Sequence, residues 1–270
     1  MTPDQSWRFH ADHYTTPARA TGWLGRTCPS ALFYAKVVAI VLRCSRLARQ
    51  GHYDQFAWAR SSDEVVGSLE ASGCRFQVDG LANLDQIDRP CLFIGNHMST
   101  LETFALPAML VPRCGQLTYV VKRSLIEYPF FKHVMLSRNP VVVDRVNPRD
   151  DLKAVLEQGA ARLAGGYSIV IFPQHTRTVT FDPEQFNTIG IKLAARTGAP
   201  VVPVALHTSA WSPGKHLKDF GPLIPSRPIR FAFGLPFEVT GKGNDEHRRI
   251  ISFIQEHLAK WQQQQTETGR

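Results

Sequence analysis

The ten residues FIGNHMSTLE, Phe93–Glu102, decide the prediction of the fold. A short apolar run ends at Gly95, and Ser99 followed three residues later by Glu102 is typical of the start of a helix. The stretch therefore predicts a buried strand that turns into a helix. His97 lies in the predicted connecting turn.

His97 and Glu102 have a spacing that suits a general base. A carboxylate in the first turn of a helix can hydrogen-bond with a histidine in the preceding turn. It then fixes the tautomer and stabilises the protonated ring, while the other ring nitrogen takes a proton from a hydroxyl. The alternative needs no chemistry, because Ser99 and Glu102 can form a capping box and a histidine in a turn is often ordinary polar surface. This stretch alone leaves both interpretations open.

Composition limits the class of protein. The chain has 270 residues, of which 43% are hydrophobic and 20% charged, and this indicates one large domain or a domain with an appendage. The formal net charge of +8 favours an anionic partner, such as nucleic acid, an anionic membrane surface or a phosphorylated substrate. Five scattered cysteines without metal-ligand spacing indicate a reducing compartment and no structural zinc.

Residues 31–48, ALFYAKVVAIVLRCSRLA, predict a helix near the N-terminus. Its uninterrupted apolar part spans about 18 Å as a helix, against roughly 30 Å of bilayer hydrocarbon, so it is too short to span a membrane comfortably. An apolar stripe with flanking arginines suits a helix in the membrane interface, and an ordinary core helix fits equally well. The run ends among arginines and not at a small-residue cleavage site, so it does not predict a secretory signal.

Strands and helices alternate through the middle of the chain. This order predicts an α/β fold with a largely parallel, mixed sheet flanked by helices. The predicted strands are at 76–78, 91–94, 117–122, 141–143, 168–172, 201–206 and 229–233, and the predicted helices are at 100–110, 151–164, 189–197 and 250–261. Pro107 should kink the first of these helices.

Four loops leave the carboxyl ends of predicted strands and carry a histidine or a cation, namely His97, Lys122, Arg145 and Arg177. Ligands bind at this edge in open α/β sheets. A histidine–carboxylate pair beside two or three cations fits a base that acts next to a phosphate, because arginine offers a bidentate fork to phosphate oxygens. Each cation taken alone is better explained as a solvated surface charge, and it is the shared placement of the cations that favours a binding site.

Several motifs occur in the order found in the 1-acylglycerol-3-phosphate acyltransferase superfamily, and this resemblance covers roughly residues 70 to 240. The segments that resemble the four sequence blocks of the family are NHMSTLE at 96–102, VVVDR at 141–145, FPQHTRT at 172–178 and VVPVAL at 201–206. FQVDGLANL at 76–84 and FAFGLPFEV at 231–239 are similar to the segments that flank these blocks.

The resemblance implies a glycerolipid acyltransferase fold and an O-acyltransferase reaction. A fatty acyl group would move from an acyl-CoA or acyl-carrier-protein thioester to the hydroxyl of a lysophospholipid, 1-acyl-sn-glycerol-3-phosphate or a related lysolipid. His97 would be the general base and Glu102 its partner, without a metal or another cofactor. The implied substrate-binding residues are Asn96, Lys122, Arg145, Gln174, His175, Thr176 and Arg177.

The family also commonly carries an N-terminal helical membrane motif, which favours the interface interpretation of residues 31–48. We therefore expect a membrane-interface segment at 1–68, an acyltransferase α/β domain at 69–262 and a polar tail at 263–270. The expected location is the cytoplasmic face of the inner membrane, with peripheral or monotopic attachment. The expected partners are a membrane lipid acceptor, the membrane surface, and acyl-CoA or acyl carrier protein, with no nucleic acid.

The first and third blocks depart from the family pattern. Glu102 stands where aspartate is more usual, a variant that the wider superfamily uses. Gln174 replaces a glutamate associated with acceptor binding and His175 replaces a glycine, which leaves open a non-glycerophosphate acceptor such as an amino-acid lipid. A catalytically weakened lipid-binding module is a further alternative, against which the retention of both His97 and Glu102 argues. The absence of a Gly-x-Ser-x-Gly elbow disfavours a thioesterase, and no recognition motif supports nucleic-acid binding.

Overall fold

The computed structural model describes residues 7–18, 21–129, 131–214 and 220–268. Within these residues the fold is built on an eight-stranded sheet. The strands lie in the order β1-β2-β8-β7-β3-β6-β4-β5. Their bounds are β1 (Tyr14–Thr15), β2 (Phe76–Asp79), β3 (Leu92–Gly95), β4 (Leu117–Lys122), β5 (Val141–Val143), β6 (Ser168–Ile171), β7 (Val201–His207) and β8 (Ile229–Phe233). Most neighbours are parallel, whereas β8 is antiparallel to β7 and β1 to β2. The predicted mixed, largely parallel α/β sheet is confirmed.

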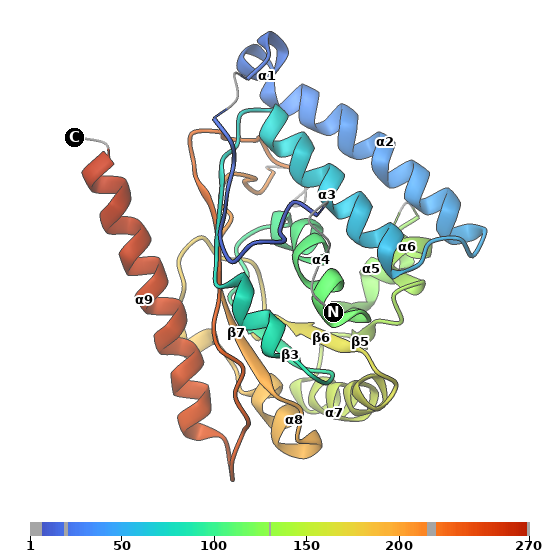
Figure 1. Ribbon diagram of the computed structural model, residues 1–270. Coiled ribbons are helices and arrows are strands. Elements are labelled where there is room, and N and C mark those ends of the chain that lie inside the picture. The colour runs from blue at the N-terminus through green and yellow to red at the C-terminus, as the bar shows by residue number, and fades with distance from the viewer. Residues whose placement is uncertain (1–6, 19–20, 130, 215–219, 269–270) are drawn as a thin grey trace.

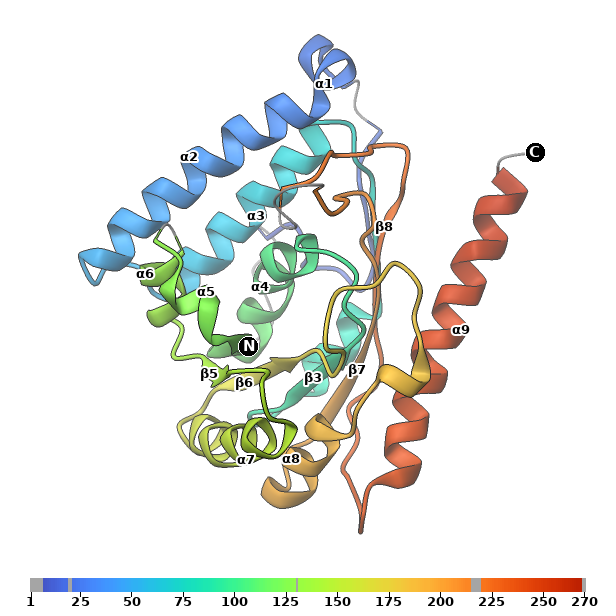
Figure 2. The same ribbon diagram turned by 180° about the vertical axis from the view of Figure 1, so that it is seen from behind.

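Helices cover both faces of this sheet. Figure 1 shows α2, α3 and α4 on one side and α8 and α9 on the other, and the view from behind shows the same two layers (Figure 2). The bounds are α1 (Trp23–Thr27), α2 (Pro29–Arg49), α3 (Gln55–Ala71), η1 (Leu81–Gln86), α4 (Leu101–Cys114), α5 (Arg123–Glu127), α6 (Lys132–Leu136), α7 (Pro148–Ala164), η2 (Pro183–Gln185), α8 (Ile189–Thr197) and α9 (Asn244–Thr268). Strands covered on both faces read as continuous apolar runs, which is why the sequence predicts them well.

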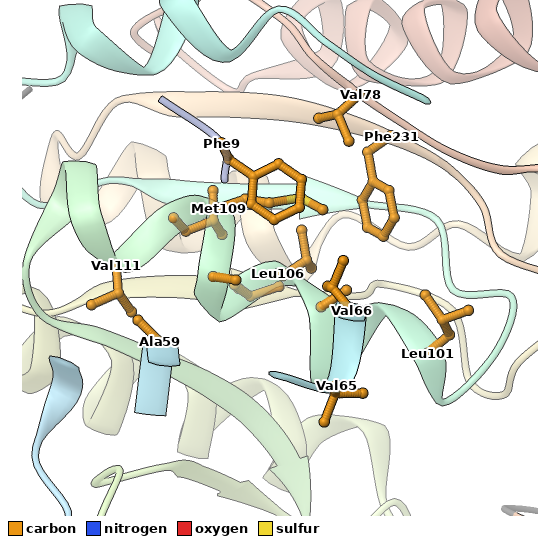
Figure 3. Close-up of a cluster of buried hydrophobic side chains, with 14 of the residues drawn as sticks. Phe9, Ala59, Val65, Val66, Val78, Leu101, Leu106, Met109, Val111 and Phe231 are labelled. Carbon is orange, nitrogen blue, oxygen red and sulfur yellow. The ribbon is translucent and has the colours of Figure 1, made fainter. Parts of the chain in front are cut away.

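Alternate side chains of the central strands enter two separate cores. Phe93 of β3 belongs to the core on the side of α2, α3 and α4, whereas Leu92 and Ile94 belong to the core on the side of α7, α8 and α9. This division follows from the two-residue period of a strand. Figure 3 shows part of the first core, in which Leu106 of α4 and Phe231 of β8 are buried together.

Helix α4 runs through Pro107, where the sequence predicts a kink. The hydroxyl of Ser62, from α3, lies within the hydrogen-bond ladder of α4 at this point. Ser62 Oγ accepts from Ala108 N at 3.0 Å and donates to Phe104 O. A side chain inserted into the hydrogen-bond ladder is a common cause of helix bends. Ser62 is inserted at the same turn of α4 that contains Pro107.

Helix α3 is not among the elements predicted from the sequence, although it contacts both α2 and α4. The reason is that its buried face carries hydroxyl side chains among the apolar ones, including Ser61, Ser62 and Ser68. Ser61 Oγ donates to Trp58 O at 2.9 Å and Ser68 Oγ donates to Glu64 O at 2.8 Å. These bonds satisfy the hydroxyls, but the serines interrupt the apolar period that predicts a helix. The boundary expected between residues 68 and 69 falls within α3.

The predicted helix at 31–48 is present as α2, and its two faces differ. Phe33 and Val37 are buried in the core, whereas Val38 and Leu42 on the outer face are 47% and 51% exposed. Among the helices in the described part of the chain, none has both the length and the apolarity needed to cross a membrane. The inner stripe is thus a core element, and attachment of the outer stripe to a membrane remains a prediction.

The C-terminal helix is longer than expected. α9 continues to Thr268, so residues 263–268, expected as a polar tail, extend the helix, and residues 269–270 lie outside the described part of the chain. Glutamine and glutamate are good helix formers, and the first glycine comes at 269. The polar composition of this segment predicts a tail, but its residues have a high helix propensity and therefore extend α9.

Candidate active site

Five neighbouring strands end at the same edge of the sheet. β7, β3, β6, β4 and β5 are parallel, so their carboxyl ends form one row. The residues at the end of these strands or in the loops that follow them are, in the order of the strands, Thr208, His97, Gln174, Lys122 and Arg145. The common edge that the sequence predicts for the site residues is therefore present.

His97 and Glu102 form a hydrogen-bonded pair near the centre of this edge. His97 Nδ1 and Glu102 Oε1 lie 2.8 Å apart. The side chain of Glu102 is fully buried, whereas that of His97 keeps 14% exposure. Because Nδ1 faces the carboxylate, Nε2 is the ring nitrogen that can accept a proton from a bound molecule.

Glu102 accepts hydrogen bonds from four further donors. These are Met98 N at 2.7 Å, Ser99 N at 2.9 Å, Ser99 Oγ at 2.9 Å and Thr208 Oγ1 at 2.6 Å. Burial on its own would raise the pKa of Glu102, but hydrogen bonds from His97, Thr208 and Ser99 lower this pKa below its ordinary value. Glu102 is therefore an anion at neutral pH and stabilises the protonated form of His97.

Phe172 stacks on the imidazole ring of His97. The two ring centroids are 4.4 Å apart and the ring planes differ by 5°. The contact fixes the plane of the imidazole, and the negative face of the phenyl ring attracts a cation. Phe172 can therefore stabilise a positive charge on the imidazole through the ring face, and Glu102 can do this through the hydrogen bond with Nδ1.

Asn96 and Gln174 brace the turn that carries His97. Both side chains are buried, and Asn96 bonds with Leu206 twice: Nδ2 donates to O at 2.9 Å, and Oδ1 accepts from N at 2.8 Å. Gln174 Oε1 accepts from His97 N at 2.6 Å, and its Nε2 donates to Thr178 Oγ1 at 2.7 Å. Both ends of each amide are bonded within the protein, which differs from the substrate contact that the sequence analysis expects of them.

Arg145 and Arg177 lie near each other at the same edge. Arg145 Nη1 donates to His175 O, and Arg177 Nη1 donates to Thr100 Oγ1 at the start of α4. Burial lowers the pKa of Arg145, the charge of Asp151 raises it, and the neighbouring charge of Arg177 lowers it. Two guanidinium groups that repel each other gain stability from an anion placed between them, so the pair suits a phosphate.

The backbone of Arg145 adopts the left-handed conformation, with φ at 57°. Asp151 Oδ1 supports this turn by accepting from Asp144 N at 2.9 Å and from Arg145 N at 3.1 Å. The left-handed region costs a residue with a side chain about 1–2 kcal/mol, and such strain is concentrated at functional sites. The turn holds the Arg145 side chain at the edge of the sheet beside the loop that contains Arg177.

The remaining predicted residues lie on the same edge but are exposed. Lys122 is the last residue of β4, and His175 and Thr176 lie in the loop after β6. Neither Phe172 nor Thr208 is among the site residues predicted from the sequence. Each of these two residues follows directly on a strand of a recognised block, and that position at the common edge is the signal that could have identified them.

Known proteins resemble this chain in sequence and in fold. Residues 75–207 match the family model described as Acyltransferase. Residues 75–207 thus form a domain of this acyltransferase family. It is 34% identical over 142 residues to a 1-acyl-sn-glycerol-3-phosphate acyltransferase of Pseudomonas aeruginosa, and the match covers 53% of each chain. A relative with the same name from Saccharomyces cerevisiae is 28% identical over 181 residues, which cover 66% of this chain and 56% of the yeast protein.

The likeness to a solved acyltransferase structure is one of fold. The crystal structure of the 1-acyl-sn-glycerophosphate acyltransferase PlsC from Thermotoga maritima superposes with a TM-score of 0.66 at 16% identity, over 87% of this chain and 95% of that one. The chain spans about half the length of the P. aeruginosa and yeast relatives. The family model and the sequence relatives, together with this fold, confirm the predicted superfamily.

Replacing Gln174 with glutamate should shift the pH dependence of a reaction in which His97 is the base. A carboxylate can still accept from His97 N, and it adds a negative charge that stabilises the protonated imidazole. We expect the acidic limb of the kcat/KM profile to move to higher pH, because the base is protonated over a wider range. Gln185→Glu, which adds the same charge at an exposed position of η2, is the control. Identical profiles for the two variants would contradict a bracing role next to the imidazole.

Proposed function

We propose that this chain is a 1-acyl-sn-glycerol-3-phosphate acyltransferase, which transfers a fatty acyl group from a thioester to the hydroxyl of a lysophospholipid. The observation that carries the proposal is the His97–Glu102 pair on the same sheet edge as Arg145 and Arg177. A base and a phosphate-binding pair at one edge match an acceptor that has both a hydroxyl and a phosphate. The names of the P. aeruginosa and yeast relatives support the same reaction.

The proposed reaction uses His97 twice. Nε2 takes the proton of the acceptor hydroxyl as the oxygen forms a bond with the thioester carbonyl carbon. Glu102 and Phe172 stabilise the imidazolium that forms. The tetrahedral intermediate then collapses, the carbon–sulfur bond breaks, and the leaving thiolate receives the proton from His97. The thioester is already an activated acyl group, so the proposed reaction uses neither a cofactor nor a covalent acyl-enzyme.

Replacing Arg145 with alanine should raise the KM for the acceptor by about tenfold or more, because a charge-assisted hydrogen bond to phosphate contributes about 1.5–3 kcal/mol. We expect kcat to change less, since the His97–Glu102 pair does not depend on this side chain. Steady-state kinetics at varied acceptor concentration measure both values. Arg149→Ala removes an exposed cation from the first turn of α7 and is the control. An unchanged acceptor KM in Arg145→Ala would remove the proposed phosphate contact.

The position of Gln174 bears on the choice of acceptor. The glutamate that it replaces is associated with acceptor binding, but here both ends of the Gln174 amide hold the turn of His97. The exchange of glutamate for glutamine therefore alters the support of the site and leaves Arg145 and Arg177 in place. This favours the ordinary phosphate-bearing acceptor over the amino-acid lipid that the third block alone leaves open.

The reaction is tested by thiol release from a long-chain acyl-CoA in the presence of a panel of lysolipids. Release that depends on 1-acyl-sn-glycerol-3-phosphate would support the proposal, and release that depends on a different lysolipid would replace the acceptor. Acyl carrier protein is the second donor to be supplied, because the donor is part of the proposal. Absence of transfer with both donors and every acceptor would favour the lipid-binding module.

We propose that the chain attaches peripherally or monotopically to the cytoplasmic face of the inner membrane. The outer face of α2 supports this proposal, because Val38 and Leu42 are exposed near Lys36 and Arg43. Trp23 of α1 is 75% exposed, and tryptophan favours the membrane–water interface. Fractionation of cells tests the location, and a chain found wholly in the supernatant would contradict it.

A further inference from the structure

Three segments at the candidate active site each contain a cation and, close to it in the sequence, an exposed apolar side chain. The pairs, with the cation first, are Lys122 with Leu125, Arg145 with Val146, and Arg177 with Val179. The exposed fractions of the three apolar residues, in this order, are 41%, 86% and 57%. We call Leu125, Val146 and Val179 the apolar rim.

The apolar rim lies on one edge of the sheet. Its three members come from the segments after β4, β5 and β6, which are neighbours in the sheet order β6-β4-β5 and run parallel. A single exposed valine is ordinary on a protein surface, but apolar side chains that gather around a binding site mark an interaction surface. The cations in the same segments exclude a purely apolar partner, since charged groups are costly to bury without a counter-charge.

We infer that the apolar rim and its cations dock the carboxyl edge of the sheet onto an anionic lipid surface. The inference rests on the proposed lipid acceptor and adds the surface from which that acceptor enters. Lipid phosphates complement Lys122, Arg145 and Arg177, while the valine and leucine side chains enter the interface beside the head groups. A lysophospholipid then brings its head group to Arg145 and Arg177 and its hydroxyl toward His97 while its acyl chain stays among the lipids.

Exposed apolar side chains continue from the rim toward α2. α5 follows directly on β4, and α6 contacts both α5 and α2. Figure 2 shows α5 and α6 near the end of α2. Tyr128 at the end of α5 is 41% exposed, and Leu136 at the end of α6 is 47% exposed. The rim is thus connected through α5 and α6 with the helix that carries the other exposed apolar stripe.

Vesicle binding by the full-length chain tests the inference directly. Val146→Ser combined with Val179→Ser should weaken partitioning into vesicles of equimolar phosphatidylcholine and phosphatidylglycerol by about tenfold, because two apolar side chains no longer leave water. Val146→Trp should strengthen partitioning, since tryptophan favours the interface. Leu235→Ser is the matched control, because Leu235 is 49% exposed in the turn after β8, which is antiparallel to β7 and ends at the opposite edge.

Activity separates this inference from the proposed function. The double serine variant should lose activity toward acceptor embedded in vesicles at low lipid concentration, and it should keep activity toward a short-chain acceptor dissolved as monomers. Partitioning equal to that of the wild type and Leu235→Ser would overturn the inference. Unchanged partitioning with a raised KM for acyl carrier protein would overturn it as well and assign the rim to that acidic protein. Altered partitioning in a chain without transferase activity would keep the inference and reject the function.

Discussion

Replacing His97 with alanine should reduce acyl transfer by about 10³-fold or more, within the range found for general acid–base groups. The imidazole is the group proposed to take the hydroxyl proton, and its Nδ1 is held 2.8 Å from Glu102 so that Nε2 is free for this task. Water can replace a base only at far lower efficiency, since it is neither positioned nor basic enough. Acceptor-dependent thiol release from acyl-CoA measures the loss.

The structure also predicts that the His97→Ala protein folds. The side chain is partly exposed, and its loss removes the ring stack with Phe172 and the hydrogen bond to Glu102. The backbone bond to Gln174 remains, and Glu102 keeps its donors from Met98, Ser99 and Thr208. Circular dichroism and thermal unfolding should therefore resemble those of the wild type. His10→Ala, at an exposed position in the N-terminal segment, is the control for the loss of a histidine. Turnover close to normal in His97→Ala would refute the general-base mechanism.

Replacing Glu102 with glutamine should reduce transfer by about 10²-fold or more and also destabilise the fold. A neutral amide cannot stabilise the imidazolium of His97. In addition, the carboxylate faces donors from Met98, Ser99 and Thr208, so the amide nitrogen of glutamine would meet hydrogen-bond donors in a fully buried site. An unsatisfied buried donor costs about 1–3 kcal/mol. Steady-state kinetics and chemical denaturation measure the two effects.

Glu102→Asp is the matched control, because it keeps the charge and moves the carboxylate back by one methylene. It should retain more activity than Glu102→Gln, in line with the aspartate that the family more often carries at this position. Equal activities of the two variants would show that the charge of Glu102 does not contribute to the reaction.

The pH dependence of stability provides a second test of Glu102, namely of its lowered pKa. Its pKa is lower in the folded protein than in the unfolded chain, so the folded state binds its proton less readily. The resulting stabilisation is fully present above the unfolded pKa of about 4.3, and it is lost as the pH falls through the lower folded pKa. The free energy of unfolding of the wild type should therefore fall more steeply below about pH 4.3 than that of Glu102→Gln. Parallel curves would contradict the lowered pKa.

Most of the sheet could be predicted because its strands are buried on both faces. Val141–Val143 and Val201–His207 are nearly continuous apolar runs bounded by polar or turn residues. The antiparallel direction of Ile229–Phe233 could not be predicted, because it depends on where the chain enters the sheet and not on the residues of the strand. Helix α3 was missed for a different reason, since serines on its buried face mask the apolar period.

The candidate site, like the fold, could be predicted from the sequence only in part. The spacing of His97 and Glu102 predicts a local hydrogen bond, which is present. Asn96 and Gln174 occur in the right blocks, but their side chains brace the turn, a placement that depends on Leu206 and Thr178. A residue type within a motif therefore identifies the region of the site but not whether a side chain faces the substrate or the protein.

The sequence by itself determined the alternation of strands and helices, the His97–Glu102 spacing and the order of the cations at the strand ends. Each of these is a local pattern, because residue periodicity and short-range hydrogen bonds act over a few positions. Only the tertiary structure decided which distant residues complete the site. Thr208 donates to Glu102 across 106 residues, and Gln174 accepts from His97 across 77. Parallel strands bring the ends of distant segments to one edge of the sheet. The spacing of residues along the chain does not show which of these strand ends are neighbours, because that depends on the order of the strands in the sheet.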